Sequence, residues 1–159
     1  MPSTNAGGPP GTTFPLTRLE HRPLYMEMPE AKQNRLQEVR HALLTLHKAL
    51  VESERITYES TVGAIRSPNH FLRLLTQDPW FAWLQPLSQL IVSMDEALDA
   101  KEPLAATAVD ALLKQTRLML VPAENSEGFA RHYFDALQRD PDVVLAHGEL
   151  MKVLGRRKT

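Results

Sequence analysis

The sequence predicts an all-α protein, a single helical bundle of about six helices with a long first helix, preceded by an extended arm rich in proline and glycine. Three observations predict this class. Apolar residues recur in steps of three and four, which keeps them on one face of a helix. Dipeptides of Ser or Asp followed by Pro divide the chain into helix-sized pieces. The alternation of apolar and polar residues that marks a half-buried strand is missing.

The composition fits one ordinary globular domain. The chain has 159 residues, of which 43% are hydrophobic and 23% charged, enough to bury a core without metals or disulfides. The formal net charge of −1 provides no field that would attract nucleic acid or anionic lipid. Cysteine is absent, so disulfides, thiolate nucleophiles and thiolate metal sites are excluded together.

The sequence indicates a cytoplasmic location and no membrane partner. The first residues, MPSTNAGGPPGTTFPL, lack the basic start and apolar stretch of a secretory signal. No later run approaches the roughly 18 apolar residues that a membrane span requires.

The arm is predicted over residues 1–29, which contain six of the twelve prolines and three of the seven glycines. Such a segment lacks donors and backbone preference for regular structure, so we expect it to be extended or flexible. Its apolar residues, including Tyr25 and Met26, are candidates to bind a partner or to pack loosely on the domain. The bundle is predicted over residues 30–155, and a short basic tail over residues 156–159.

The first helix is expected to begin at Glu30 and to run for about 35 residues. Its apolar stripe consists of Leu36, Val39, Leu43, Leu46 and Leu50. We expect a bend or break near residues 53–57, where the stripe shifts by one position. Carboxylates such as Glu52 and Glu54 are assigned to solvated faces.

Three later boundaries are predicted from N-cap residues followed by proline, at Ser67-Pro68, Asp78-Pro79 and Asp140-Pro141. The helix from Pro79 to Leu98 is expected to be central in the bundle. Pro86 lies inside it and predicts a kink, or a short turn before the helix restarts at Gln85-Pro86. Further helices are expected over residues 103–121, 126–139 and 141–154.

The segment HFLRLLTQDP, from His70 to Pro79, recurs 62 residues later as HYFDALQRDP, from His132 to Pro141. One interpretation is an old duplication, which predicts two helix pairs related by a pseudo-twofold axis. The other is that each copy is an amphipathic helix whose terminal Asp-Pro starts the next helix. This second explanation needs no shared function.

The sequence contains no assembled catalytic motif. There is no nucleophile elbow and no phosphate-binding glycine loop. The one Glu-x-x-His pair, Glu38 with His41, falls opposite the apolar stripe of the first helix, towards solvent. No cofactor is therefore expected. As an alternative, a metal or small ligand could be held between helices by histidines, and the candidates are His47, His70, His132 and His147.

The most distinctive stretch is DPWFAWLQPLSQLIVSMDEAL, from Asp78 to Leu98, which contains both tryptophans. Trp80, Phe81 and Trp83 are candidates for a partner-facing aromatic patch, the other interpretation being a helix enclosed on most sides. The stretch resembles a segment of an uncharacterised family of small bacterial all-helical proteins. The resemblance implies a bacterial, soluble, all-helical protein, and it implies no activity or site residues.

From these observations we expect a non-catalytic protein-protein interaction or scaffold protein that acts through a helical surface and through the arm. The alternative is a helical bundle, which would include an enzyme, with a small ligand or metal in an inter-helix pocket. A homo-oligomer is compatible with the wide apolar stripe of the first helix. Nucleic acid is not expected as a partner for a chain of this charge.

Overall fold

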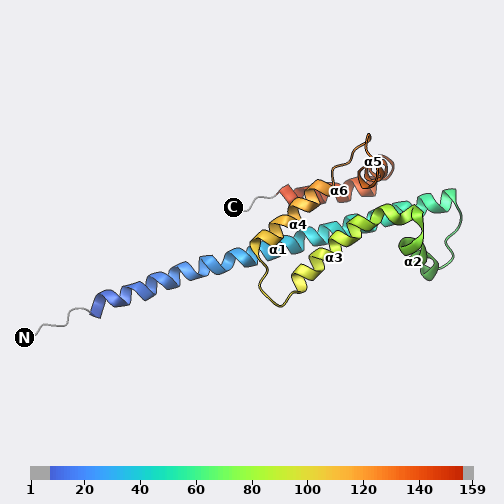
Figure 1. Cartoon of the computed structure of the whole chain (residues 1–159). Coiled ribbons are helices and arrows are strands. Elements are labelled where there is room, and N and C mark those ends of the chain that lie inside the picture. Colours follow the sequence, from blue (N-terminus) through green and yellow to red (C-terminus); the bar gives the residue numbers. More distant parts are fainter. Residues whose placement is uncertain (1–7, 156–159) are drawn as a thin grey trace, which may run out of the picture.

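The computed structural model describes residues 30–155 with their side chains, and it consists there of helices joined by short loops, without strands (Figure 1). The elements are α1 (Gly8–Thr61), α2 (Pro68–Gln77), the 3₁₀ helix η1 (Pro79–Leu84), α3 (Gln85–Asp99), α4 (Ala106–Met119), α5 (Phe129–Arg139) and α6 (Pro141–Gly155). The all-α class and the long first helix are confirmed. The side chains of the arm predicted over residues 1–29, including Tyr25 and Met26, lie outside the described residues, as does the tail.

The described part of α1 is the element around which the others pack. The main packing contacts of α1 are with α3, α4, α6 and η1. Those of α3 are fewer, with α1, α4 and η1. The expectation that the helix following Pro79 would be central is therefore wrong. The physical reason is length: α1 is long enough to present its stripe to several shorter helices at successive levels.

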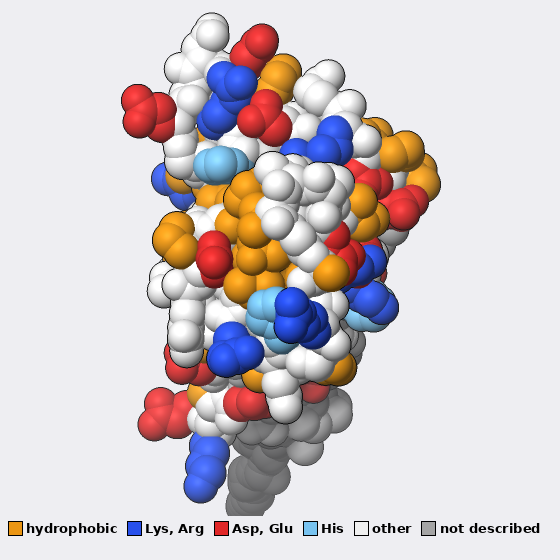
Figure 2. Space-filling view, turned by 90° about the vertical axis from the view of Figure 1, so that its right-hand side faces the viewer, with side chains coloured by type: hydrophobic (Ala, Val, Ile, Leu, Met, Phe, Trp, Pro, Cys, Tyr) orange, Lys and Arg blue, Asp and Glu red, His pale blue; other side chains and the backbone are white. Residues whose placement is uncertain are grey.

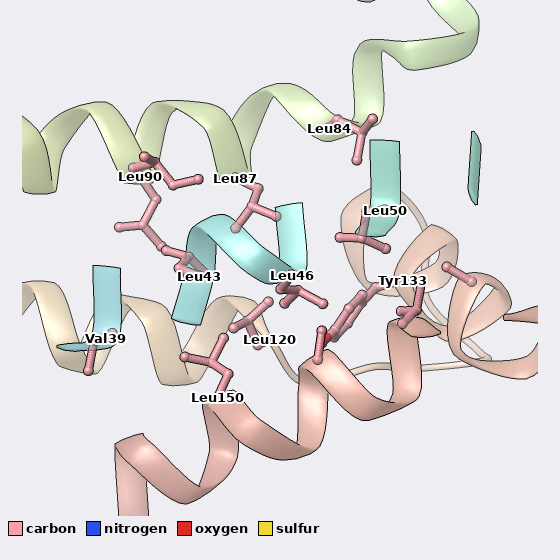
Figure 3. Close-up of a cluster of buried hydrophobic side chains, with 14 of the residues drawn as sticks. Val39, Leu43, Leu46, Leu50, Leu84, Leu87, Leu90, Leu120, Tyr133 and Leu150 are labelled. Atoms are coloured by element: carbon pink, nitrogen blue, oxygen red, sulfur yellow. The ribbon is translucent and has the colours of Figure 1, made fainter. Parts of the chain in front are cut away.

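The apolar stripe of α1 forms the middle of the core. Its five members are fully buried: Leu36, Val39, Leu43, Leu46 and Leu50. Figure 3 shows Leu43, Leu46 and Leu50 between Leu84, Leu87 and Leu90 on one side and Leu120, Tyr133 and Leu150 on the other. The steps of three and four therefore did identify the buried face. The expected break near residues 53–57 does not occur, because α1 continues as a helix to Thr61.

The three predicted caps are confirmed in atomic detail. The Ser67 hydroxyl accepts a hydrogen bond from the His70 amide at 3.0 Å. The Asp78 carboxylate accepts one from the Trp80 amide at 2.8 Å. The Asp140 carboxylate accepts one from the amide two residues later at 2.9 Å. In each case proline takes the first helical position, where a backbone donor would have no partner.

The second of the two alternatives for Pro86 is the one observed. Residues 79–84 form the 3₁₀ helix η1, and α3 begins at Gln85 with Pro86 in its first turn. Proline is tolerated there because the first amides of a helix have no intrahelical acceptor.

Two predicted boundaries are each displaced by three residues. The fourth helix begins at Ala106 rather than Pro103, and Leu104 packs against the core from the preceding loop. The fifth begins at Phe129 rather than Ser126. Its N-cap is Gly128, whose φ of 70° lies in the left-handed region that glycine adopts most easily.

The two copies of the repeated segment, residues 70–79 and 132–141, have the same local structure at their C-terminal ends. The Asp78 amide donates to the Leu74 carbonyl and the Asp140 amide donates to the Ala136 carbonyl, both at 3.0 Å. Each Asp thus ends one helix with its amide and starts the next with its carboxylate. The shared Asp-Pro junction between helices accounts for the repeated sequence by itself. A duplication stays a prediction.

The C-terminal end of α6 is fixed by side chains from two other helices. Arg35 of α1 and Arg117 of α4 donate to the Leu154 carbonyl at 2.8 Å and 3.0 Å. Cations at a helix C-terminus satisfy its unpaired carbonyls and suit its dipole. None of the described helices is both long and apolar enough to cross a membrane.

Replacing Asp140 with Ala should lower the free energy of unfolding by about 1 kcal/mol, because the first turn of α6 loses its acceptor. Urea denaturation followed by circular dichroism measures the change. Asp99→Ala is the matched control, since exposed Asp99 is the last residue of α3, where a negative charge opposes the helix dipole. An equal loss of stability in both variants would contradict the capping role.

Candidate functional site

The aromatic residues singled out in the sequence lie in η1, and two of them are buried. Phe81 is fully buried and Trp83 is 8% exposed, while Trp80 is half-buried. The interpretation of Phe81 and Trp83 as partner-facing side chains is corrected by this burial. The reason is that η1 lies between α1, α2 and α5, so that each side of its short turn meets a neighbour.

Tyr58 near the end of α1 organises the first part of this aromatic cluster. Its ring centroid lies 5.6 Å from that of Trp80, edge to face, and 5.5 Å from that of Phe81. Phe71 of α2 adds an edge-to-face contact with Phe81 at 5.8 Å. Such pairs contribute about 0.5–1.5 kcal/mol beyond their area burial. The indole nitrogen of Trp80 is buried without a hydrogen-bond partner among the described residues.

Trp83 instead takes part in a buried polar network around Glu54. The Trp83 indole donates to one Glu54 oxygen at 3.0 Å, and the Arg139 guanidinium donates to the other at 2.5 Å. Arg139 also donates to the Ser53 hydroxyl at 3.1 Å. The Glu54 side chain is only 8% exposed, whereas that of Arg139 is 34% exposed. The network links α1, η1 and α5.

The burial of Glu54 corrects its assignment to a solvated face. Glu54 lies one turn beyond Leu50, on the continuation of the buried stripe, and Ser53 beside it is 2% exposed. A carboxylate in that position needs a charged partner and hydrogen-bond donors, because an unpaired buried charge is very costly. Arg139 and Trp83 supply them.

A second chain of contacts connects α5 to η1 and α6. The His132 ring stacks on Trp83, with centroids 5.2 Å apart and planes 15° apart. Phe129 packs on Trp83 at 5.5 Å and on Tyr133 at 5.4 Å. The Tyr133 hydroxyl lies 2.5 Å from Nδ1 of His147 on α6. Burial raises the pKa of Tyr133 well above its usual value and lowers the pKa of His147.

The four candidate histidines do not come together. His47 forms a 2.9 Å hydrogen bond with Ser88 between α1 and α3, and burial lowers the pKa of His47. His70 accepts the Arg66 amide at 3.0 Å beside the cap of α2. His132 stacks on Trp83. His70 and His132, which occupy matching positions in the repeated segment, therefore have separate surroundings. Within residues 30–155 no three His, Asp or Glu side chains gather where they could hold a metal ion.

A groove between α1 and α6 was not predicted from the sequence. It has a volume of about 780 Å³. Its polar lining consists of Asn34, Gln37, Glu38, His41 and Thr45 of α1 and Glu149 of α6. Glu38 and His41 are exposed, as the position of the stripe predicted. The signal for the groove is the polar run at every third or fourth position along α1, beside the apolar stripe.

Figure 2 shows the end of the molecule on the side of α2 and α5, where hydrophobic side chains gather in the middle of the face and charged side chains surround them. Exposed apolar residues on the elements at this end include Ile56, Val62 and Leu72, each more than half exposed. Single exposed apolar side chains are normal on protein surfaces, and only their gathering suggests a contact surface.

Comparison with protein-family models, with curated proteins and with solved structures found no match in any of the three. The geometry therefore carries the functional argument alone. The polar side chains buried in the described core are used in contacts between or within helices: Glu54 and Ser53 with Arg139, and Thr116 with the Leu112 carbonyl.

A double-mutant cycle on Glu54→Gln and Arg139→Gln should give a coupling of about 1.5–3 kcal/mol, because the carboxylate is buried and one third of the arginine side chain reaches solvent. Urea denaturation of the four proteins measures it. The matched cycle uses Arg131 and Asp135, an exposed pair on the same helix, for which about 0.5 kcal/mol is expected. Equal coupling in the two cycles would show that burial does not strengthen the Glu54 pair.

Proposed function

We propose that this protein is a non-catalytic interaction or scaffold protein, and that it binds an apolar surface of another protein through the outer face of α6. The single observation that carries the proposal is that α6 exposes two large apolar side chains, Val144 and Leu145, on the side turned away from the described core. The proposal replaces the buried η1 aromatics with a surface that is accessible in the described structure.

The inner face of α6 is part of the core. Val143, Leu150 and Leu154 are at most 3% exposed, and Ala146 is 6% exposed. On the outer side, Val144 is 47% exposed and Leu145 is 68% exposed. A surface helix usually has a polar outer face, and exposed Glu149 and Lys152 do lie on the same side of α6 as Leu145. The two large apolar side chains exposed beside these charges support contact with a partner.

Gly148 gives a second reason to expect a partner at this face. It lies in the middle of α6, where glycine costs about 1 kcal/mol of helix stability relative to alanine. A Cβ built at Gly148 would meet no atom within 4 Å, so packing inside this chain does not require glycine. Val144 and Gly148 are four residues apart and share one side of the helix, which continues to Met151, partly buried against the core. A missing side chain there would allow the backbone of another helix to approach closely.

The other parts of the proposal rest on the sequence. A cytoplasmic location is part of the proposal, and a bacterial source is implied by the resemblance of residues 78–98. The near-neutral net charge of −1 permits a second copy of the chain as one form of the partner. Binding of a small ligand is the second candidate function, and the polar groove between α1 and α6 favours it.

Leu145→Glu should abolish partner binding while changing the free energy of unfolding by no more than about 0.5 kcal/mol, because Leu145 is a surface residue. Sedimentation velocity measures self-association, and quantitative capture from a cell lysate measures binding of other proteins. Leu118→Glu is the matched control, since Leu118 has the same 68% exposure but lies on α4.

The control should keep the associations of the unaltered protein. Two results would contradict the proposal: an unaltered protein that neither self-associates nor captures any protein, or a Leu145→Glu variant that keeps every association. In either case the groove between α1 and α6 would become the better candidate site.

A further inference from the structure

Side chains of α5 reach three other elements, α1, η1 and α6. The contacts are those of Arg139 with Glu54, of His132 and Phe129 with Trp83, and of Tyr133 with His147. Tyr133 is fully buried by the docking of α5, and Figure 3 shows its ring between Leu46, Leu50 and Leu120. The position of α5 therefore determines whether this part of the core is covered.

The buried hydroxyl of Tyr133 determines which proton state of His147 fits the docked helix. Because burial raises the pKa of Tyr133, the phenol keeps its proton and must donate it. Among the described residues, its hydrogen-bond partner is Nδ1 of His147 at 2.5 Å. Nδ1 accepts that proton only in the neutral ring that carries its own proton on Nε2. Protonation of Nδ1 would leave the buried O–H group without an acceptor.

We propose that the Tyr133–His147 pair is a pH-sensitive latch, which holds α5 against α6 at neutral pH and releases α5 in mildly acidic solution. Release uncovers the apolar surface around Leu46, Leu50 and Leu120, which a docked Tyr133 covers. The latch is independent of the binding surface proposed on the outer face of α6, and it adds a condition under which a second, larger apolar surface becomes accessible.

The direction of the pH effect follows from linkage. Burial lowers the pKa of His147 in the docked state, and the pKa returns towards the ordinary value of about 6.5 when α5 is released. The released state then binds a proton more readily than the docked state. The docked state is fully stabilised above pH 6.5, and this stabilisation is lost as the pH falls through the lowered pKa.

Most of the other charged groups near α5 and α6 have partners of their own: Glu54 with Arg139, Arg131 with Asp135, Glu149 with Lys152, and Arg35 and Arg117 on the Leu154 carbonyl. The Asp140 carboxylate caps α6, and Asp142 lies exposed in the first turn of that helix. His132 stacks on Trp83 and takes no part in the hydrogen bond of the Tyr133 hydroxyl. The proposal therefore assigns release in acid to His147.

Hydrogen exchange of the full chain, read by mass spectrometry in peptides covering residues 129–139, tests the latch at pH 7.5 and pH 5.5. After correction for the intrinsic pH dependence of amide exchange, α5 should exchange about threefold to tenfold faster at pH 5.5, since each pKa unit between the two states allows up to tenfold. Peptides from α4, which contains no histidine, provide the internal reference.

Three variants make the test specific. His147→Gln keeps an acceptor for the Tyr133 hydroxyl that does not titrate, so α5 should exchange equally at both pH values. Tyr133→Phe keeps the ring but needs no acceptor, and it should weaken the pH response even if the Gln variant folds poorly. His47→Gln alters the histidine between α1 and α3, and it should leave the pH response of α5 intact.

An unaltered protein whose α5 exchanges at the same corrected rate at both pH values would overturn the proposal. So would a full pH response in both the His147→Gln and the Tyr133→Phe variants, because the response would then come from another group.

Discussion

The buried stripe of α1 is the constraint on which the rest of the described structure depends. Its five apolar side chains have no solvent exposure, and α3, α4 and α6 all pack against the helix that carries them. Isolated helices of about 15 residues are marginal in water, so the shorter helices depend on this common surface for much of their stability. The packing of the bundle is thus a set of contacts with one long helix rather than a ring of equivalent helices.

Polar contacts at the two ends of this core fix how the shorter helices are placed along α1. At one end Arg35 of α1 and Arg117 of α4 share the Leu154 carbonyl at the end of α6. At the other end Glu54 of α1 receives Arg139 from the end of α5. Apolar packing alone is weakly directional, whereas each of these hydrogen bonds has a defined geometry. If the helices slid along one another, the bonds would break and leave polar groups unpaired. The same end that carries the Glu54 pair also carries the Tyr133–His147 pair, so polar groups concentrate where α5 docks.

The fold was predictable because it depends on local rules, and the candidate sites were less so because they depend on distant partners. The stripe from Leu36 to Leu50 and the caps at Asp78 and Asp140 each require only residues within a few positions in sequence. Glu54 could have been placed inside, since continuing the same steps from Leu50 reaches residues 53 and 54. Its partner Arg139 lies 85 residues away, and no local pattern connects the two. The burial of Phe81 and Trp83 likewise depends on α2 and α5, which the spacing within η1 does not reveal.

Native-state hydrogen exchange in increasing urea tests the central place of α1 most directly. If all other helices depend on its stripe, the amides of residues 39–54 should exchange only through global unfolding, with the urea dependence and free energy of the whole chain. Amides of α2 and α5 should exchange through smaller openings while α1 remains protected. The account would be contradicted if α1 opened at a lower free energy than α4 or α6, because those helices would then be stable without the surface on which they pack.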